Sequence, residues 1–135
     1  MRPSYLLDSN VVIRFLVKDH LDHWEKAKNL FLRAEDGMCE LVLAPWIVAE
    51  VVYTLCSVYR MDKKRVTEAV ETLIRSAGIL TMDSDIILDG LRRFREKSVS
   101  FTDALLASQA VAMKIQPATF DSDFDKFQDI RRFEP

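Results

Sequence analysis

The sequence predicts an α/β fold in which helices cover both faces of a central parallel sheet. Short β-prone stretches alternate with longer helical stretches along the chain, and this order is typical of parallel β-α units. The chain has 135 residues, which fits one domain spanning residues 1–135. Hydrophobic residues make up 49% of the chain and charged residues 30%, so the domain can bury a sizeable core beneath an ordinary soluble surface.

Five short stretches are expected to form the strands of this sheet. The first four are apolar or β-prone, and each is followed by a polar step or by a helical stretch. The fifth is a short stretch near the C-terminus. The expected strands are residues 5–7, 41–43, 79–82, 118–120 and 131–133.

Helices are expected between these strands, mainly because apolar residues recur there at helical spacing. Gly37 and Gly78 end two of them, since glycine commonly follows the last residue of a helix. Pro45 suits the first turn of another helix. The expected helices are residues 11–17, 23–34, 45–59, 66–77, 83–97, 100–113 and 124–127.

Charge and cysteine usage narrow the function classes. The formal net charge of −2 gives no overall basic surface for coating a nucleic acid. The basic run at residues 92–97 is either a solvated helix end or a local contact for phosphates. Cys39 and Cys56 lie far apart and lack the spacing of a zinc site. No targeting or membrane-spanning segment is visible, so we expect a soluble cytoplasmic protein.

Four carboxylates stand out because they follow or interrupt apolar stretches. Asp8 ends the first expected strand, and Asp121 follows the fourth. Glu50 lies in a helix that should be mostly buried, and Asp103 opens the apolar helix near residue 100. Burying an unpaired carboxylate costs several kcal/mol, so a buried one is paired, protonated or bound to a metal.

Three of these carboxylates also have a purely structural explanation that the sequence leaves open. Glu50 can be the partner in a buried ion pair. Asp103 can be the third residue of a capping box that begins at Ser100. Asp121 can cap the short helix that follows it, since aspartate is a favoured N-cap.

The four carboxylates are expected to meet at one edge of the sheet. Asp8 and Asp121 both follow parallel strands, and the carboxyl ends of such strands share one edge. Glu50 and Asp103 lie on helices that can reach the same crevice. Four close carboxylates repel one another strongly, and a hard divalent cation such as Mg²⁺ resolves that repulsion. Such a site suits phosphodiester hydrolysis, in which a metal activates water and stabilises the leaving oxygen.

The segment around Asp8 offers three good N-caps in a row, namely Asp8, Ser9 and Asn10. Asp8 alone would most simply cap the helix that follows. Because three further carboxylates can reach the same edge, we instead expect Asp8 to be a metal ligand. Capping is then left to Ser9 and Asn10.

Two other metal motifs do not fit. The acidic turn that begins at Asp121 opens like a calcium loop, but Lys126 stands at its sixth position and Arg132 at its twelfth. His20 and His23 lie three residues apart on a polar connector with no further ligands nearby in sequence. We therefore expect these two histidines to be ordinary surface residues.

Four features together carry a family resemblance. They are the segments 7–11 (LDSNV), 101–107 (FTDALLA) and 119–121 (TFD), with Glu50 in its apolar helix. In this order and at these distances they resemble a PIN-domain ribonuclease, and most of all the VapC-type toxins of toxin–antitoxin pairs. The resemblance covers essentially the whole chain. It implies a PIN-like three-layer α/β/α sandwich whose central parallel sheet has about five short strands.

The resemblance also implies roles for individual residues. The catalytic acids would be Asp8, Glu50, Asp103 and Asp121, around one or two Mg²⁺ or Mn²⁺ ions. The metal ligands would be Asp8, Asp103 and Asp121, with Asp123 replacing or assisting Asp121. Ser9 and Asn10 would orient Asp8, and Thr119 would line the site. A basic rim for RNA would draw on Arg14, Lys63, Lys64, Arg65, Arg92, Arg93, Arg95 and Lys97.

The function implied by the resemblance is that of a Mg²⁺-dependent endoribonuclease, acting as the toxin of a toxin–antitoxin pair. The expected partners are an RNA substrate, a second copy of the chain, and an antitoxin whose C-terminal segment covers the acidic groove. Two alternatives stay open. One is a PIN-like housekeeping nuclease that acts on DNA or precursor RNA, and the other is a non-catalytic binding module.

Overall fold

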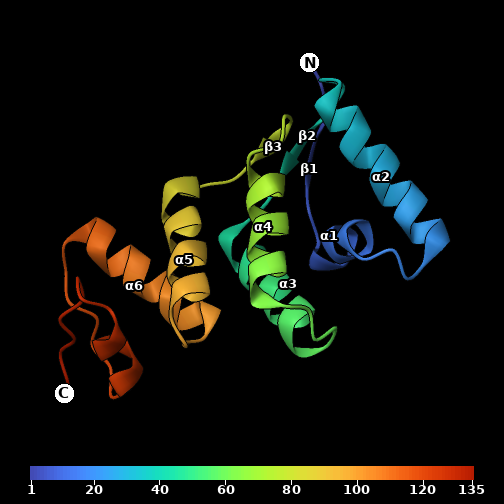
Figure 1. Ribbon diagram of the computed structural model, residues 1–135. Coiled ribbons are helices and arrows are strands. Elements are labelled where there is room, and N and C mark those ends of the chain that lie inside the picture. Colours follow the sequence, from blue (N-terminus) through green and yellow to red (C-terminus); the bar gives the residue numbers. More distant parts are fainter. The chain divides into compact units, whose positions relative to one another are not determined.

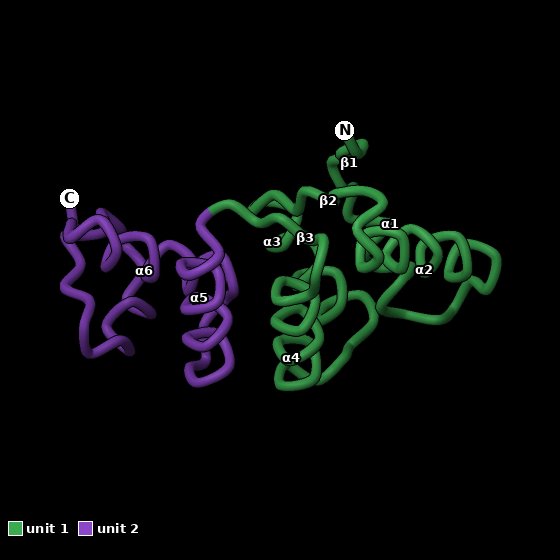
Figure 2. The backbone as a smooth tube through the Cα atoms, turned by 90° about the horizontal axis from the view of Figure 1, so that it is seen from above, with its two compact units in different colours: residues 1–82 green, residues 83–135 purple.

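A computed structural model describes all of residues 1–135. It contains three short strands, six α-helices and one 3-10 helix (Figure 1). The chain falls into two compact units, residues 1–82 and 83–135 (Figure 2). None of the helices is long and apolar enough to span a lipid bilayer. The alternation of strands and helices confirms the predicted α/β class.

The first unit is built on a parallel three-stranded sheet with the strand order β1-β2-β3. Tyr5 of β1 pairs with Leu41 of β2, which pairs with Ile79 of β3. Helix α2 packs against β2 and helix α4 against β3. The elements of this unit are β1 (Ser4–Leu6), α1 (Ser9–Leu16), α2 (Leu21–Glu35), β2 (Glu40–Val42), α3 (Pro45–Ser57), α4 (Lys63–Ile74) and β3 (Ile79–Leu80).

The core of the first unit follows the apolar periodicity of the sequence. Leu41 on β2 is fully buried, and Leu43 follows it at 1% exposure. Helices α3 and α4 each bury one apolar stripe, because amphipathic helices turn their apolar faces inward. Their buried members are Val48, Val51, Val52 and Leu55 on α3, and Val66, Val70, Leu73 and Ile74 on α4.

Gly78 is the residue at which the chain turns from α4 into β3. Its φ of +84° lies in the left-handed region, and a Cβ atom at this position would lie 2.3 Å from the carbonyl oxygen of Ala34. Gly37 has a similar φ of +78°, but a Cβ atom there would meet nothing closer than the Arg2 Nη1 atom, at 4.0 Å. These two glycines therefore separate the effect of backbone strain from the effect of close packing.

We expect Gly78→Ala to lower the free energy of unfolding by about 3 kcal/mol or more, because left-handed strain adds to a steric clash. We expect Gly37→Ala to cost only about 1–2 kcal/mol, which is the left-handed strain alone. Urea denaturation of the two variants measures the difference. Equal losses in the two variants would contradict a role for the approach to Ala34.

The second unit is a helical hairpin with a short C-terminal segment against it. Its elements are α5 (Ser84–Glu96), α6 (Phe101–Met113) and the 3-10 helix η1 (Ser122–Lys126). Helices α5 and α6 approach closely at Gly90, where a Cβ atom would lie 3.3 Å from the Leu105 Cα. Ile87, Leu91 and Phe124 are almost completely buried in this unit. Glycine is unfavourable inside a helix, but at position 90 the close approach of α6 leaves little room for a larger side chain.

The prediction of about five strands is wrong, because the sheet has three. The expected strand at residues 79–82 is limited to Ile79–Leu80. The two expected C-terminal strands make only one isolated parallel bridge, between Ala118 and Phe133. Thr119 ends this extended stretch, because its hydroxyl accepts a hydrogen bond from the Asp121 amide and starts a turn.

Candidate metal centre

Three carboxylates of the second unit come together at the N-terminal end of α6. Asp103 lies in the first turn of α6, Asp121 immediately precedes η1, and Asp123 lies within η1. One carboxylate oxygen from each residue lies within 4.8 Å of those of the other two. Within either unit, no other group of three histidine, cysteine, aspartate or glutamate side chains comes this close. We call these three residues the acidic cluster.

Local hydrogen bonds fix the backbone beneath the acidic cluster. The Asp103 amide donates to the Ser100 hydroxyl at 3.1 Å, so Ser100 caps α6 as one of the sequence alternatives anticipated. The Asp121 amide donates to Thr119 Oγ1 at 3.0 Å. The Asp123 amide donates to Asp121 Oδ1 at 2.8 Å, which makes Asp121 the N-cap of η1. Capping and cluster membership therefore do not exclude each other at Asp103 and Asp121.

The electrostatics of the acidic cluster favour a bound cation. Burial raises the pKa of Asp103, and the charges of Asp121 and Asp123 raise it further. Three hard oxygen donors at this spacing suit Mg²⁺ or Mn²⁺ better than softer metals. The donor set of the cluster therefore fits a divalent cation, and it offers a carboxylate from each of Asp103, Asp121 and Asp123.

Asp8 lies in the first unit, at the carboxyl end of β1 and at the start of α1. Its side chain is exposed, and its Oδ1 accepts a hydrogen bond from the Ser9 amide at 2.9 Å. Asp8 is therefore itself the N-cap of α1, so the expectation that Ser9 and Asn10 would take this role is wrong.

Glu50 lies on α3 of the first unit and is exposed, so the expectation of a buried carboxylate is wrong. The buried stripe of α3 runs through Val48, Val52 and Leu55, and Glu50 falls on the other side of the helix. Trp46 and Tyr53, four residues before it and three after it, share its exposed side, and each is 68% exposed. The apolar run around Glu50 thus contains residues that do not enter the core.

Comparison with known proteins identifies the family. The model of the PIN domain family matches residues 5–130, which include all five of these carboxylates. This chain belongs to the PIN-domain family. PIN domains are generally nucleases, and PIN nucleases generally use divalent metal ions. The acidic cluster is consistent with that chemistry.

Two further comparisons add little to the family assignment of this PIN domain. No curated protein matches the chain significantly in sequence. A crystal structure of VapBC2 from Rickettsia felis bound to a DNA fragment from their promoter is similar at 16% sequence identity. That match covers 97% of this chain and 99% of the other, with a TM-score of 0.39, which marks a loose similarity in backbone shape.

The supporting residues expected for the PIN domain have different surroundings. Ser9 is 4% exposed, and only its backbone amide contacts the Asp8 carboxylate. Thr119 bonds the Asp121 amide and so holds the turn of the acidic cluster. Asn10 instead lines a cavity of about 380 Å³ together with residues of α1 and α2, among them Arg14 and Lys26. Both cations are paired with carboxylates of their own unit, Asp19 and Asp22 respectively.

His20 and His23 are both exposed in the PIN domain, as expected. Their rings stack at 3.9 Å between centroids, and His20 Nδ1 accepts a hydrogen bond from the His23 amide. His20 thereby caps the N-terminus of α2. Its role in the first unit is structural, and no carboxylate or cysteine joins the pair to complete a metal site.

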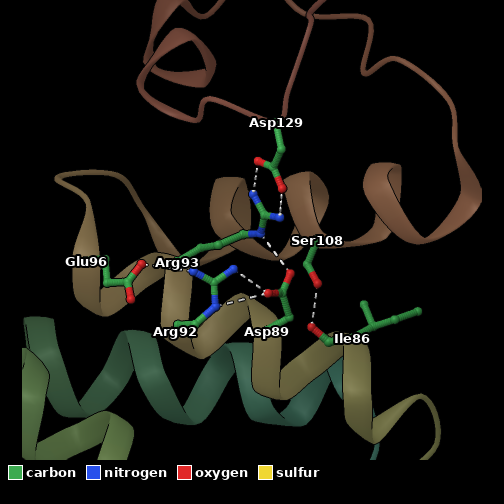
Figure 3. A network of polar contacts seen from close by, with 7 residues as sticks. All are labelled: Ile86, Asp89, Arg92, Arg93, Glu96, Ser108 and Asp129. Atoms are coloured by element: carbon green, nitrogen blue, oxygen red, sulfur yellow. Dashed lines mark hydrogen bonds and ion pairs between the residues drawn. The ribbon is translucent and has the colours of Figure 1, made fainter.

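The basic run of α5 forms ion pairs, and Arg93 in particular is no candidate for the rim (Figure 3). Arg93 is only 4% exposed, donates from Nη1 to Asp129 Oδ1 at 2.7 Å, and also bonds that carboxylate through Nη2. Its Nε donates to Asp89 Oδ2 at 2.7 Å. Arg92 bonds Asp89 and Glu96. The expectation that Arg93 contacts RNA is therefore wrong.

Sequence reasoning missed Lys126 as a member of the site in the PIN domain. Its Nζ lies 3.0 Å from Asp123 Oδ1. The sequence held one signal, since Lys126 lies three residues after Asp123 and such a spacing places two side chains on one side of a helical turn. From the sequence alone, Lys126 is informative only because a lysine at this position does not fit a calcium-binding loop.

Proposed function

We propose that this PIN domain is a divalent-cation-dependent endoribonuclease, acting as the toxin of a toxin–antitoxin pair. The observation that carries the proposal is the acidic cluster, three carboxylates with oxygens within 4.8 Å of one another. Three carboxylates this close repel one another, which favours a bound cation, and a nuclease family supplies a reason for holding one. The family match spans both compact units, which supports the proposal that residues 1–135 work as one domain.

In this proposal the catalytic acids are Asp8, Glu50, Asp103 and Asp121. Asp8, Asp103 and Asp121 would hold Mg²⁺ or Mn²⁺, with Asp123 either replacing or assisting Asp121, and Ser9, Asn10 and Thr119 would support them. A divalent cation bound there supplies the activation of water and the stabilisation of charge on the leaving oxygen. The carboxylates would fix the position of the cation and so orient the scissile phosphodiester. The capped turns at Ser100 and Asp121 hold the ligands in place.

The toxin role rests on the sequence resemblance to VapC-type proteins in the segments around Asp8, Glu50, Asp103 and Asp121. A toxin role implies a cognate antitoxin that covers the acidic groove. It also implies a homodimer and a cytoplasmic location. RNA as the substrate rests on the same resemblance. None of these needs a strongly basic surface, since the metal and a local rim of cations would contact the phosphates.

We expect the purified protein to cleave RNA in the presence of Mg²⁺ or Mn²⁺ and to lose this activity when EDTA removes the cation. A gel assay on a structured RNA, with DNA of the same sequence as a control, measures the activity. Expression of the protein should arrest growth, and co-expression of the adjacent small gene product should relieve the arrest. Cleavage that survives EDTA would contradict the proposed mechanism.

Other outcomes of the same assay favour the remaining functions. Cleavage of DNA or precursor RNA without growth arrest would favour a housekeeping nuclease. A binding module predicts no cleavage and no rise in melting temperature with Mn²⁺, whereas a real metal site stabilises the fold by mass action. The melting experiment therefore tests the site even if the preferred RNA has not been found.

A further inference from the structure

Lys126, at the end of η1, joins the two sides of the acidic cluster. Its Nζ donates to the carbonyl oxygen of Ser98 at 2.7 Å and lies 3.0 Å from Asp123 Oδ1. Ser98 belongs to the connector between α5 and α6, two residues before the α6 N-cap. Lys126 is thus bound both to the acidic turn and to the segment from which Asp103 projects.

An exposed ion pair alone would say little, since isolated surface pairs contribute weakly. The side chains of Lys126 and Asp123 are 43% and 42% exposed. Lys126 differs from an isolated surface pair because it has a second acceptor. One of the three N–H donors of its ammonium group bonds the Ser98 carbonyl, and this bond fixes the ammonium group beside the cluster. A lysine held at two points acts as a fixed positive charge rather than a mobile one.

The three carboxylates of the cluster are not equivalent as ligands. Asp123 already neutralises the Lys126 ammonium group, whereas Asp121 caps η1 through Oδ1 and forms no ion pair with Lys126. Asp103 lies in the first turn of α6, and the Lys126 ammonium group pairs with Asp123 rather than with Asp103. The positions left for a metal therefore lie on the side of Asp103 and Asp121, and the side of Asp123 already holds a positive charge.

We propose that the Lys126 ammonium group occupies the place of a second metal ion, so that the acidic cluster binds a single divalent cation. This inference rests on the proposed function and specifies how many cations that site takes. Of the acidic cluster, Asp103 and Asp121 then contribute ligands to the cation, and Asp123 serves as the counter-ion of Lys126 instead of as a ligand. The third N–H of Lys126 is left for water or for an oxygen of the substrate phosphate.

The test is the stoichiometry of Mn²⁺ binding to the full chain, measured by isothermal titration calorimetry at neutral pH. The wild-type protein should bind one Mn²⁺ equivalent that Asp103→Asn removes and that Asp123→Asn leaves in place. Lys126→Met should gain a second equivalent and bind the first about tenfold more tightly, because a positive charge within a few ångströms has been removed. The double variant Lys126→Met, Asp123→Asn should return to one equivalent.

Two further variants control for folding and for net charge. Lys126→Arg keeps the positive charge and should keep the wild-type stoichiometry. Lys114→Met removes a positive charge at the C-terminal end of α6. Position 114 lies about 16 Å along the helix from Asp103, at 1.5 Å per residue, so this variant should bind Mn²⁺ like the wild type. A melting curve of each variant shows that it is folded before the titration.

The outcomes separate this inference from the proposed function. The inference is wrong if the wild type binds two equivalents of Mn²⁺, one that Asp103→Asn removes and a second that Asp123→Asn removes, because two metals then occupy the cluster. The inference is also wrong if Lys126→Met binds no more Mn²⁺ than the wild type. If the wild type binds no Mn²⁺ that depends on Asp103, the proposed function itself fails.

Discussion

Replacing Asp103 with asparagine should abolish the response of the protein to divalent cations and reduce RNA cleavage by about a hundredfold or more, a loss of about 2.7 kcal/mol or more in transition-state stabilisation. The substitution keeps the size of the side chain and the bond from the residue 103 amide to Ser100, which is a backbone contact. It removes one of the three charges of the acidic cluster. The Mn²⁺-induced rise in melting temperature should therefore disappear.

Without metal, the same substitution should raise the melting temperature. Burial and the charges of Asp121 and Asp123 raise the pKa of Asp103, so the folded protein favours the protonated acid. A carboxyl group whose pKa is raised on folding destabilises the fold once it ionises, which happens as the pH rises above the unfolded value of about 3.9. The difference in melting temperature between variant and wild type should be small below pH 4 and should grow as the pH rises.

Asp125→Asn is a matched control for this experiment. Asp125 lies in the same acidic turn but outside the cluster, where it pairs with Arg132. Its substitution changes the net charge equally but should neither raise the melting temperature nor remove the Mn²⁺ response. If both variants behave alike in scanning calorimetry with EDTA and then with Mn²⁺, the effect belongs to net charge rather than to the cluster.

Replacing Arg93 with leucine should lower the free energy of unfolding by about 2–3 kcal/mol, because it removes the buried guanidinium group whose charged hydrogen bonds hold both Asp89 and Asp129. Arg93 is 4% exposed and bonds both carboxylates, and its guanidinium carbon lies 5.3 Å from the centroid of the Phe127 ring. Arg92→Leu on the same helix is the control. Arg92 is 45% exposed, so its loss should cost about 1 kcal/mol or less.

The contribution of Arg93 should depend on pH in the acid range. The hydrogen bonds from Arg93 lower the pKa of Asp129. Partial burial opposes the charged form of Asp89, but hydrogen bonds from Arg93 and Arg92 outweigh it and lower that pKa as well. Carboxylates with a lowered pKa stabilise the fold above their unfolded pKa of about 3.9, and this is lost as the pH falls through their folded values.

Urea denaturation at pH 7 and at pH 3 measures this dependence. The gap between wild type and Arg93→Leu should be largest at pH 7 and should narrow at pH 3. A gap of equal size at both values would mean that Arg93 acts through apolar packing of its stem. Equal losses for Arg92→Leu and Arg93→Leu at pH 7 would contradict the importance of the buried pair.

Periodicity predicted the helices to within a few residues, because burial of an apolar face dominates helix packing. It could not predict the surroundings of Arg93, since a charged residue in a basic run is normally solvated. The available signal was its position, three residues after Gly90 and four after Asp89 on α5. That spacing places Arg93 beside the tight contact with α6 and on the same side as a carboxylate.

The acidic cluster was predictable in part. Asp103 and Asp121 stand out because they open or follow apolar segments, whereas Asp123 is indicated only by the family resemblance. Lys126 was not recognised, because an ion pair at a helix end looks like ordinary surface charge. Glu50 was expected to be buried because its neighbours in sequence are apolar, yet Trp46 and Tyr53 share its exposed side. Apolar composition alone therefore does not decide which side of a helix is covered.

The register of the sheet also has a consequence for how the chain is made. Tyr5 pairs with Leu41 and Leu41 with Ile79, so the paired residues lie 41 − 5 = 36 and 79 − 41 = 38 positions apart. Bringing such distant segments together costs loop-closure entropy, which slows folding, whereas α5 and α6 follow one another directly. During synthesis, the edge of β2 that receives β3 stays open until Leu80 has left the ribosome.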